Sequence, residues 1–96
     1  MNKVILMGRL TKDPEVKTNM VRYTLAVDRR GDGADFIGCK CFGKTADFAW
    51  KYLRKGTKIL VEGHIQTGSY EKDGQTVYTT DVIVESHYFC ERKEET

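Results

Sequence analysis

The sequence predicts an all-β fold, a five-stranded barrel with one helix between strands 3 and 4. Several segments alternate apolar and polar residues, which is the pattern of strands with one buried face. Glycines such as Gly8 interrupt these segments, and a glycine inside a strand often marks the bend or bulge that lets a sheet coil. Only one segment repeats its apolar residues at helical spacing. One helix is too little to cover a doubly wound sheet, so a closed or nearly closed barrel is favoured.

The size and composition fit one globular domain. The chain has 96 residues, of which 40% are hydrophobic and 31% charged, and its formal net charge is +2. A domain over residues 1–90 and a short polar tail over 91–96 are expected. No run approaches the ~20 apolar residues of a membrane span, and the apolar N-terminal stretch is too short for a signal peptide. We therefore expect a cytoplasmic protein without membrane contact, whose anion-binding surface comes from the arrangement of charges rather than from their excess.

The predicted elements follow from local patterns. A helix is expected to begin with Thr45 as its N-cap and to end near Lys55, before Gly56. A turn over 17–20, a basic loop over 29–33 and a hairpin connection over 68–75, with Asp73-Gly74 at its tip, separate the strands. The five predicted strands are Val4–Thr11, Val21–Asp28, Ala34–Gly43, Lys58–Thr67 and Val77–Phe89. This order is that of the oligonucleotide-binding barrel, the OB-fold, whose binding face centres on its second and third strands.

The third predicted strand, Ala34–Gly43, has two different faces. Its inward face carries small apolar residues, including Cys39 and Cys41, which suits a protein interior. Its outward face carries Phe36, Gly38, Lys40 and Phe42. Flat rings for base stacking, a cation for phosphate and a glycine that allows close approach are what a nucleic-acid strand requires. The alternative is that the two rings pack under a neighbouring loop or subunit.

No catalytic or metal-binding constellation is expected. The three cysteines are an odd number in a chain without a secretory signal, so a disulfide framework is disfavoured. Cys39 and Cys41 lack a second Cys/His pair at ligand spacing, and buried free thiols are the better interpretation. His64 and His87 have no nucleophile near them in sequence, and no phosphate-binding glycine loop is present. We expect a protein that is not an enzyme and has no cofactor.

Three segments carry a resemblance to a known family. They are Asn2–Glu15, with its N-K-V-I-L-x-G-x-L-x-x-D-P-E pattern, Cys41–Lys44 running into Tyr52–Gly56, and Tyr78–Val82. Their order and spacing resemble those of the bacterial single-stranded DNA-binding protein family. The resemblance implies a homotetramer that wraps single-stranded DNA without strong sequence preference during replication, recombination and repair.

The resemblance also implies particular site residues. Phe36, Phe42 and Tyr70 stand at stacking positions of the family. Lys3, Lys44, Arg54 and Lys55 stand at basic positions beside the DNA path. The predicted DNA-binding set is completed by Arg9, Arg29, Arg30, Lys40 and Lys72, and Lys40 and Lys72 are expected to contact phosphate in preference to forming salt bridges. Trp50 on the helix is expected to pack, whereas Tyr78 lines the groove or packs between subunits.

The sequence departs from the family in three places. The stretch between Glu15 and Val21 is shorter than usual, and the loop over 28–35 is shorter and lacks an aromatic residue, so a smaller footprint or weaker binding per subunit is expected. The family ends in an acidic tip that recruits replication and repair proteins, whereas this sequence ends at Glu94-Glu95-Thr96. It is either a shortened chain or a variant without that function. A dimeric accessory factor of the primosomal kind and an adaptor whose aromatic face binds protein are the alternative interpretations. RNA binding is a weaker one.

Overall fold

A computed structural model describes residues 1–90 of the protein. These residues form six strands and one helix, in an order that matches the predicted one apart from an additional short strand. The elements are β1 (Val4–Leu10), β2 (Glu15–Lys17), β3 (Met20–Asp28), β4 (Ala34–Cys41), α1 (Lys44–Tyr52), β5 (Lys58–Lys72) and β6 (Gln75–Phe89).

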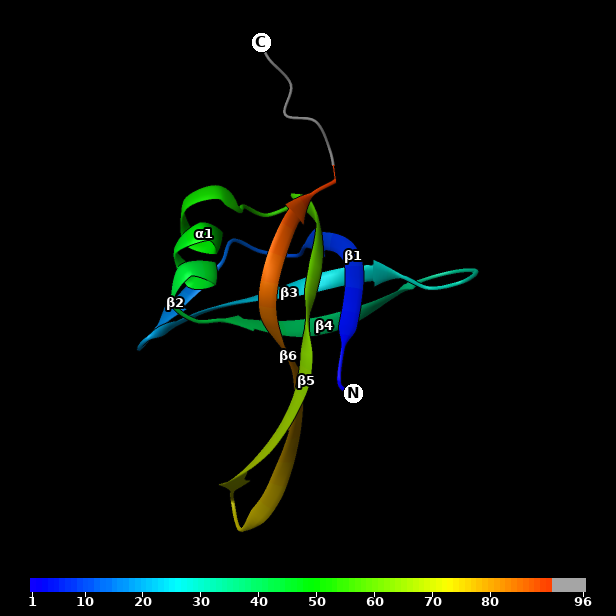
Figure 1. The fold of residues 1–96 in the computed structure, drawn as a ribbon. Coiled ribbons are helices and arrows are strands. Elements are labelled where there is room, and N and C mark those ends of the chain that lie inside the picture. Colours follow the sequence, from blue (N-terminus) through cyan, green and yellow to red (C-terminus); the bar gives the residue numbers. More distant parts are fainter. Residues whose placement is uncertain (91–96) are drawn as a thin grey trace.

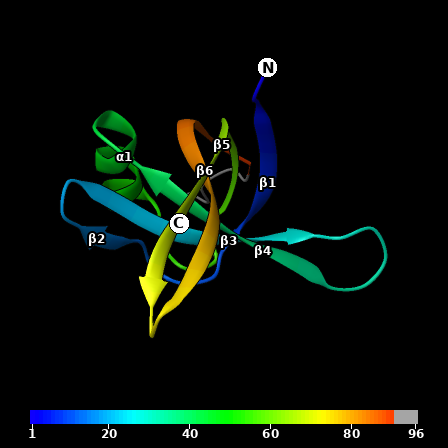
Figure 2. The same cartoon turned by 90° about the horizontal axis from the view of Figure 1, so that it is seen from below.

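The sheet closes into a barrel. Its strand order is β1-β5-β6-β4-β3-β2, and an additional pairing of β1 with β3 joins the ends. All pairings are antiparallel except that of β4 with β6. Two hairpins, β3–β4 and β5–β6, project from the barrel in different directions (Figures 1 and 2).

Gly8 allows β1 to take part in two pairings. β1 runs beside β5 from Val4 to Arg9, and its end, at Arg9 and Leu10, pairs with β3. A Cβ atom at Gly8 would collide with the backbone carbonyl of Ala26 on β3. The expectation that this glycine serves barrel formation is therefore confirmed, because only a residue without a side chain lets β3 approach here.

The core fills the barrel and the space beneath α1. Among the described residues, its thirteen buried hydrophobic side chains come from every strand except β2, from the helix and from the helix C-cap, Leu53. The predicted inward faces are confirmed at Leu25, Cys39, Cys41, Ile59 and Val61, whose side chains are fully buried. Alternation along the strands was sufficient to identify these positions, because a barrel wall has one dry face.

The helix differs from its predicted limits. It begins at Lys44 with Gly43 as its N-cap, and the Thr45 hydroxyl instead donates to the carbonyl of Phe42 at 2.8 Å. Gly43 has a φ of 58°, so the chain reverses one residue before the helix starts. The helix ends at Tyr52, and Leu53 is its C-cap rather than part of its last turn. No helix in the described residues is long and apolar enough to cross a membrane.

Two further elements differ from the prediction. The stretch Glu15–Lys17 forms the short strand β2, paired with the start of β3. The segment over 68–75 is a hairpin with Asp73-Gly74 at its tip, as predicted, but the connection is shorter than expected because β5 and β6 continue as a paired ladder to Lys72 and Gln75. Only Asp73 and Gly74 connect them, both at positive φ, as a two-residue hairpin turn requires. The predicted tail over 91–96 lies outside the described residues.

Candidate nucleic-acid interface

The outer face of β4 carries the predicted aromatic residues. Phe36 is 70% exposed, and Phe42, directly after the strand, is 49% exposed. Lys40 lies between them on the same face because side chains two residues apart point the same way along a strand. The sequence-based prediction of an open aromatic face with a cation at its centre is thus confirmed in geometry.

A three-residue ion cluster occupies the middle of this face. The Asp81 carboxylate on β6 lies 3.4 Å from the Lys40 ammonium and 3.6 Å from the Arg22 guanidinium. Arg22 lies directly opposite Lys40 in the β3–β4 register, which puts both cations on one face. Lys40 therefore has a salt-bridge partner, contrary to the sequence-based preference, and its contact with phosphate stays a prediction.

Gly38 serves this cluster. A Cβ atom at Gly38 would lie 2.8 Å from an Asp81 carboxylate oxygen and 3.1 Å from an Arg22 guanidinium nitrogen. The space above the glycine, which the sequence suggested would admit a ligand, is taken by these two side chains. The glycine lets a carboxylate sit against the strand, and the cations gather around it.

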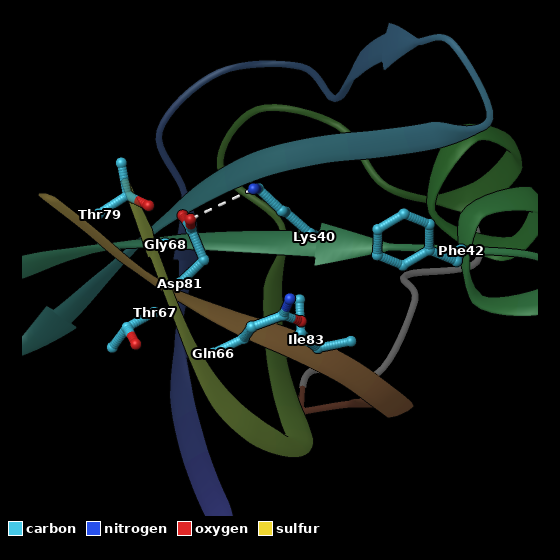
Figure 3. Close-up of a pocket in the computed structure, with 8 residues that line it drawn as sticks. All are labelled: Lys40, Phe42, Gln66, Thr67, Gly68, Thr79, Asp81 and Ile83. Atoms are coloured by element: carbon cyan, nitrogen blue, oxygen red, sulfur yellow. Dashed lines mark ion pairs between the residues drawn. The ribbon is translucent and has the colours of Figure 1, made fainter. Parts of the chain in front are cut away.

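A groove runs from β4 toward the β5–β6 hairpin. It has room for about 90 Å³ and is lined by Lys40, Phe42, Gln66, Thr67, Gly68, Thr79, Asp81 and Ile83. Figure 3 shows Lys40 pointing toward Asp81, with the Phe42 ring farther along the strand.

The hairpin extends this groove. Tyr70 and Lys72 follow Gly68 at two-residue steps on β5, so they share its face of the ladder. Both are exposed, and Tyr70 belongs to the strand rather than to a loop. Phe42, the groove and Tyr70 thus form one continuous surface, with Lys72 toward the hairpin tip.

A second hollow lies on the other side of the hairpin stem. It has room for about 370 Å³ and is lined by Val4, Leu6, Phe36, Ile37, Gly38, Ile65, Thr80, Asp81 and Val82. Tyr78 is 81% exposed on this face of the ladder, opposite Ser69. Tyr78 is therefore not part of the core of this chain, and both of its predicted roles stay open. Asp81 borders both hollows.

Three of the other predicted cations have partners of their own. Lys3 pairs with Glu62 at 2.9 Å on the β1–β5 wall, and this contact raises the pKa of Lys3 and lowers that of Glu62. Arg29 pairs with Asp35 at 2.8 Å across the base of the β3–β4 loop. The Arg54 guanidinium donates to the carbonyl of Trp50 in the helix at 3.0 Å and to that of Leu53, the C-cap, at 2.7 Å. Each of these side chains therefore has a partner within the chain, and its contact with DNA stays a prediction.

The remaining cations are distributed unevenly. Arg9 donates to the carbonyl of Gly56 at 2.9 Å, at the end of the barrel where the Lys55 backbone N–H donates to Asp13. Among the described residues, Arg30, Lys44 and Lys72 have no ion-pair partner. The structure therefore brings Lys40 and Lys72 to the aromatic surface, with Lys44 after Phe42, and places Lys3, Arg9, Arg54 and Lys55 elsewhere.

Two residues were misjudged from the sequence. Trp50 is 56% exposed on the helix and outside the core, so the expectation that it packs is wrong for this chain. Arg22 belongs to the site and was missed. It appeared only as a polar position on an alternating strand, and pairing that strand with β4 would have placed it opposite Lys40.

A polar cluster lies under the helix, apart from the aromatic surface. His87 stacks against Phe48 with the ring centres 5.0 Å apart, and burial lowers the pKa of His87 to about 4. Burial also raises the pKa of Cys39 and Cys41 to about 12, so both stay neutral thiols, as predicted. The described residues contain no group of three or more side chains suited to a metal ion.

The closed barrel, with one helix between its third and fourth long strands and an open aromatic face on the third, defines an OB-fold protein. The profile of the "Single-strand binding protein family" matches residues 1–90 of this chain. The chain belongs to this family.

Two relatives agree with this assignment, and one solved structure shares the fold. A single-stranded DNA-binding protein of Clostridium perfringens is 52% identical over 100 residues, covering 95% of this chain and 67% of the relative. One of Fusobacterium nucleatum is 44% identical over 106 residues, covering 97% of this chain and 69% of the relative. The Plasmodium falciparum protein solved as "SSB complex with ssDNA" has a TM-score of 0.81 at 23% identity, over 95% of this chain and 96% of that one, which shows the shared fold.

Proposed function

We propose that the protein binds single-stranded DNA without sequence specificity, with bases stacked on the outer face of β4. The observation that carries this proposal is the exposure of Phe36 and Phe42 on either side of Lys40. Two exposed phenyl rings on one strand face of a small barrel have little packing value, and every base offers a face for stacking. The names of the similar bacterial proteins support the same ligand.

The proposed path of the single-stranded DNA crosses the outer face of β4 and continues along the β5–β6 hairpin. Bases stack on Phe36, Phe42 and Tyr70, while phosphates contact the cations nearest them, above all Lys44 and Lys72. Lys3, Arg9, Arg29, Arg30, Arg54 and Lys55 contribute a more distant field or contacts along a wrapped strand. The shorter loops reduce the footprint of each subunit.

The wider role is proposed on kinship. The protein acts in the cytoplasm, associated with the nucleoid, as a non-catalytic partner of single strands in replication, recombination and repair. It assembles as a homotetramer, and the exposed Tyr78 contacts either the strand or a neighbouring subunit.

Fluorescence anisotropy with labelled oligo-dT, oligo-dA and a matched duplex tests the binding proposal. Both single strands should bind tightly and with similar affinity, and the duplex much more weakly. Affinity should fall with salt, with a slope of about 0.7 per phosphate contacted on a single strand. Preferential binding of the duplex would refute the proposal.

Light scattering tests the assembly separately. A mass of four chains supports the tetramer, whereas two chains would favour the dimeric accessory factor. An adaptor function would be indicated by DNA affinity that does not change when both phenylalanines are replaced by alanine.

A further inference from the structure

We propose that Asp81 competes with phosphate for Lys40 and Arg22, and so limits how tightly the protein holds a single strand. This inference rests on the proposed function. It concerns one carboxylate in the middle of a surface that otherwise suits a polyanion. Asp81 is therefore an affinity-determining residue whose removal strengthens binding.

The position of Asp81 supports this role. Its side chain is only 7% exposed, and the two cations reach it from neighbouring strands at 3.4 Å and 3.6 Å. It borders both hollows beside the hairpin stem, so a strand that crosses the face between Phe36 and Phe42 passes over it. A backbone phosphate placed there meets donors that are already engaged.

The cations do not need Asp81 for their own solvation. The side chain of Arg22 is 44% exposed and that of Lys40 is 29% exposed, so water can solvate both. Asp81 is the confined partner, held against the strand in the space that Gly38 leaves. When single-stranded DNA covers this face, one of two things happens. Either a cation leaves Asp81 to contact a phosphate, or the Asp81 carboxylate and a phosphate lie close together. Both outcomes weaken binding relative to a neutral side chain at this position.

Asp81→Asn removes the charge and keeps the shape. We expect it to raise oligo-dT affinity about threefold to tenfold, on the scale of one like charge removed a few ångströms from a phosphate. The salt slope should steepen by about 0.7 to 1.4, because one or two more phosphates find a cation. Glu85→Gln is the matched control. This variant makes the same charge change on the same strand, β6, at a carboxylate that is paired with His64. It should alter the affinity for oligo-dT less than twofold.

A second comparison leaves Asp81 intact. Lys40→Gln should reduce affinity less than Lys72→Gln, since Lys72 has no ion-pair partner among the described residues. In the Asp81→Asn background, Lys40→Gln should cost several times more than it does in the parent protein. The comparison of Lys40→Gln with Lys72→Gln in the parent protein decides the question even if Asp81→Asn does not fold.

The outcomes separate the two proposals. If the parent protein and Glu85→Gln bind no single strand, the proposed function fails. If they bind, and a folded Asp81→Asn protein binds no more tightly than the parent, or Lys40→Gln costs as much as Lys72→Gln, the competition is refuted and the function stands.

Discussion

The Tyr23 hydroxyl and the His87 imidazole form a hydrogen bond of 2.9 Å between β3 and β6, on the helix side of the barrel. The imidazole also stacks on Phe48 of α1, and the Cys41 thiol lies 3.8 Å from the same ring nitrogen. A histidine thus ties the helix to two strands, and it does so in its neutral form because burial lowers its pKa to about 4.

Stability should therefore fall as the solution becomes acidic. In the unfolded chain the pKa of His87 is near 6.5, so below that pH the unfolded state takes up a proton that the folded state resists until about pH 4. This contribution of His87 to the free energy of unfolding is fully present above its pKa in the unfolded chain. It is lost as the pH falls toward its pKa in the folded protein. Urea unfolding should show about 1 to 2 kcal/mol less stability near pH 5 than near pH 7.5, a range reduced because part of the ring is accessible.

Two variants check that His87 is the cause. His64→Gln changes a histidine that is only partly buried and should leave the pH dependence as it is, whereas His87→Gln should flatten it between about pH 7.5 and 5. Equal pH dependence in the two variants would contradict the assignment.

Replacing either phenylalanine of the β4 face should weaken strand binding. Phe36→Ala and Phe42→Ala each lose roughly 1 to 3 kcal/mol of stacking per base, which is about fivefold or more in affinity for oligo-dT. Both rings are exposed, so the unfolding transition should change little. Trp50→Ala removes an equally exposed aromatic from the helix and should bind as the parent does. Equal losses in all three variants would argue against stacking on β4.

A side chain at Gly8 should weaken the barrel at its closure. Gly8→Ala drives a methyl group into the Ala26 carbonyl, which is backbone and cannot turn aside. We expect a loss of about 2 to 3 kcal/mol, similar to other overpacked sites, measured as the free energy of unfolding. Gly68→Ala is the control, because its new methyl meets only the Thr79 hydroxyl at 3.2 Å. A Gly8→Ala protein as stable as Gly68→Ala would show that β1 and β3 are not held this closely.

The three cysteines should differ in reactivity. Cys39 and Cys41 are fully buried with a pKa of about 12, so a reagent cannot reach them and they do not form the reactive thiolate. Cys90 is partly exposed. A thiol reagent near pH 8 should modify one thiol in the native protein and three after denaturation. In Cys90→Ser the native protein should not react, and rapid labelling there would show that the barrel interior opens.

Much of the fold could be read from the sequence because the inner face of a barrel imposes strict alternation. β4 is the clearest case, since its buried cysteines and exposed phenylalanines occupy the two predicted faces. The distal half of β5 shows no such pattern because both of its faces are exposed, so the sequence predicts a hairpin connection there in place of paired strands. The three residues of β2 are all exposed and were missed for the same reason.

The site was predictable in its aromatic residues and less so in its charges. Phe36 and Phe42 stood out because large apolar side chains on a polar face are unusual. The partners of Lys40 are a different matter. Arg22 and Asp81 lie far from it in sequence and meet it only once β3, β4 and β6 are paired. A lysine in a sequence carries no sign of whether its charge is already neutralised, so Lys40 was assigned to phosphate.

The two-residue turn at Asp73-Gly74 has a consequence for how the projecting arm can vary. The β5–β6 hairpin can lose residues at its tip without changing the rest. Each side chain, however, faces one side or the other according to how many residues separate it from the barrel. Deleting one cross-strand pair between the barrel and Tyr70 rotates that ring to the opposite side, where it would face the hollow beside Phe36. Deleting two pairs restores its orientation and moves it about 7 Å nearer the barrel. The hairpin can therefore be shortened or lengthened only by an even number of cross-strand pairs if the Tyr70 ring is to contact the same DNA strand.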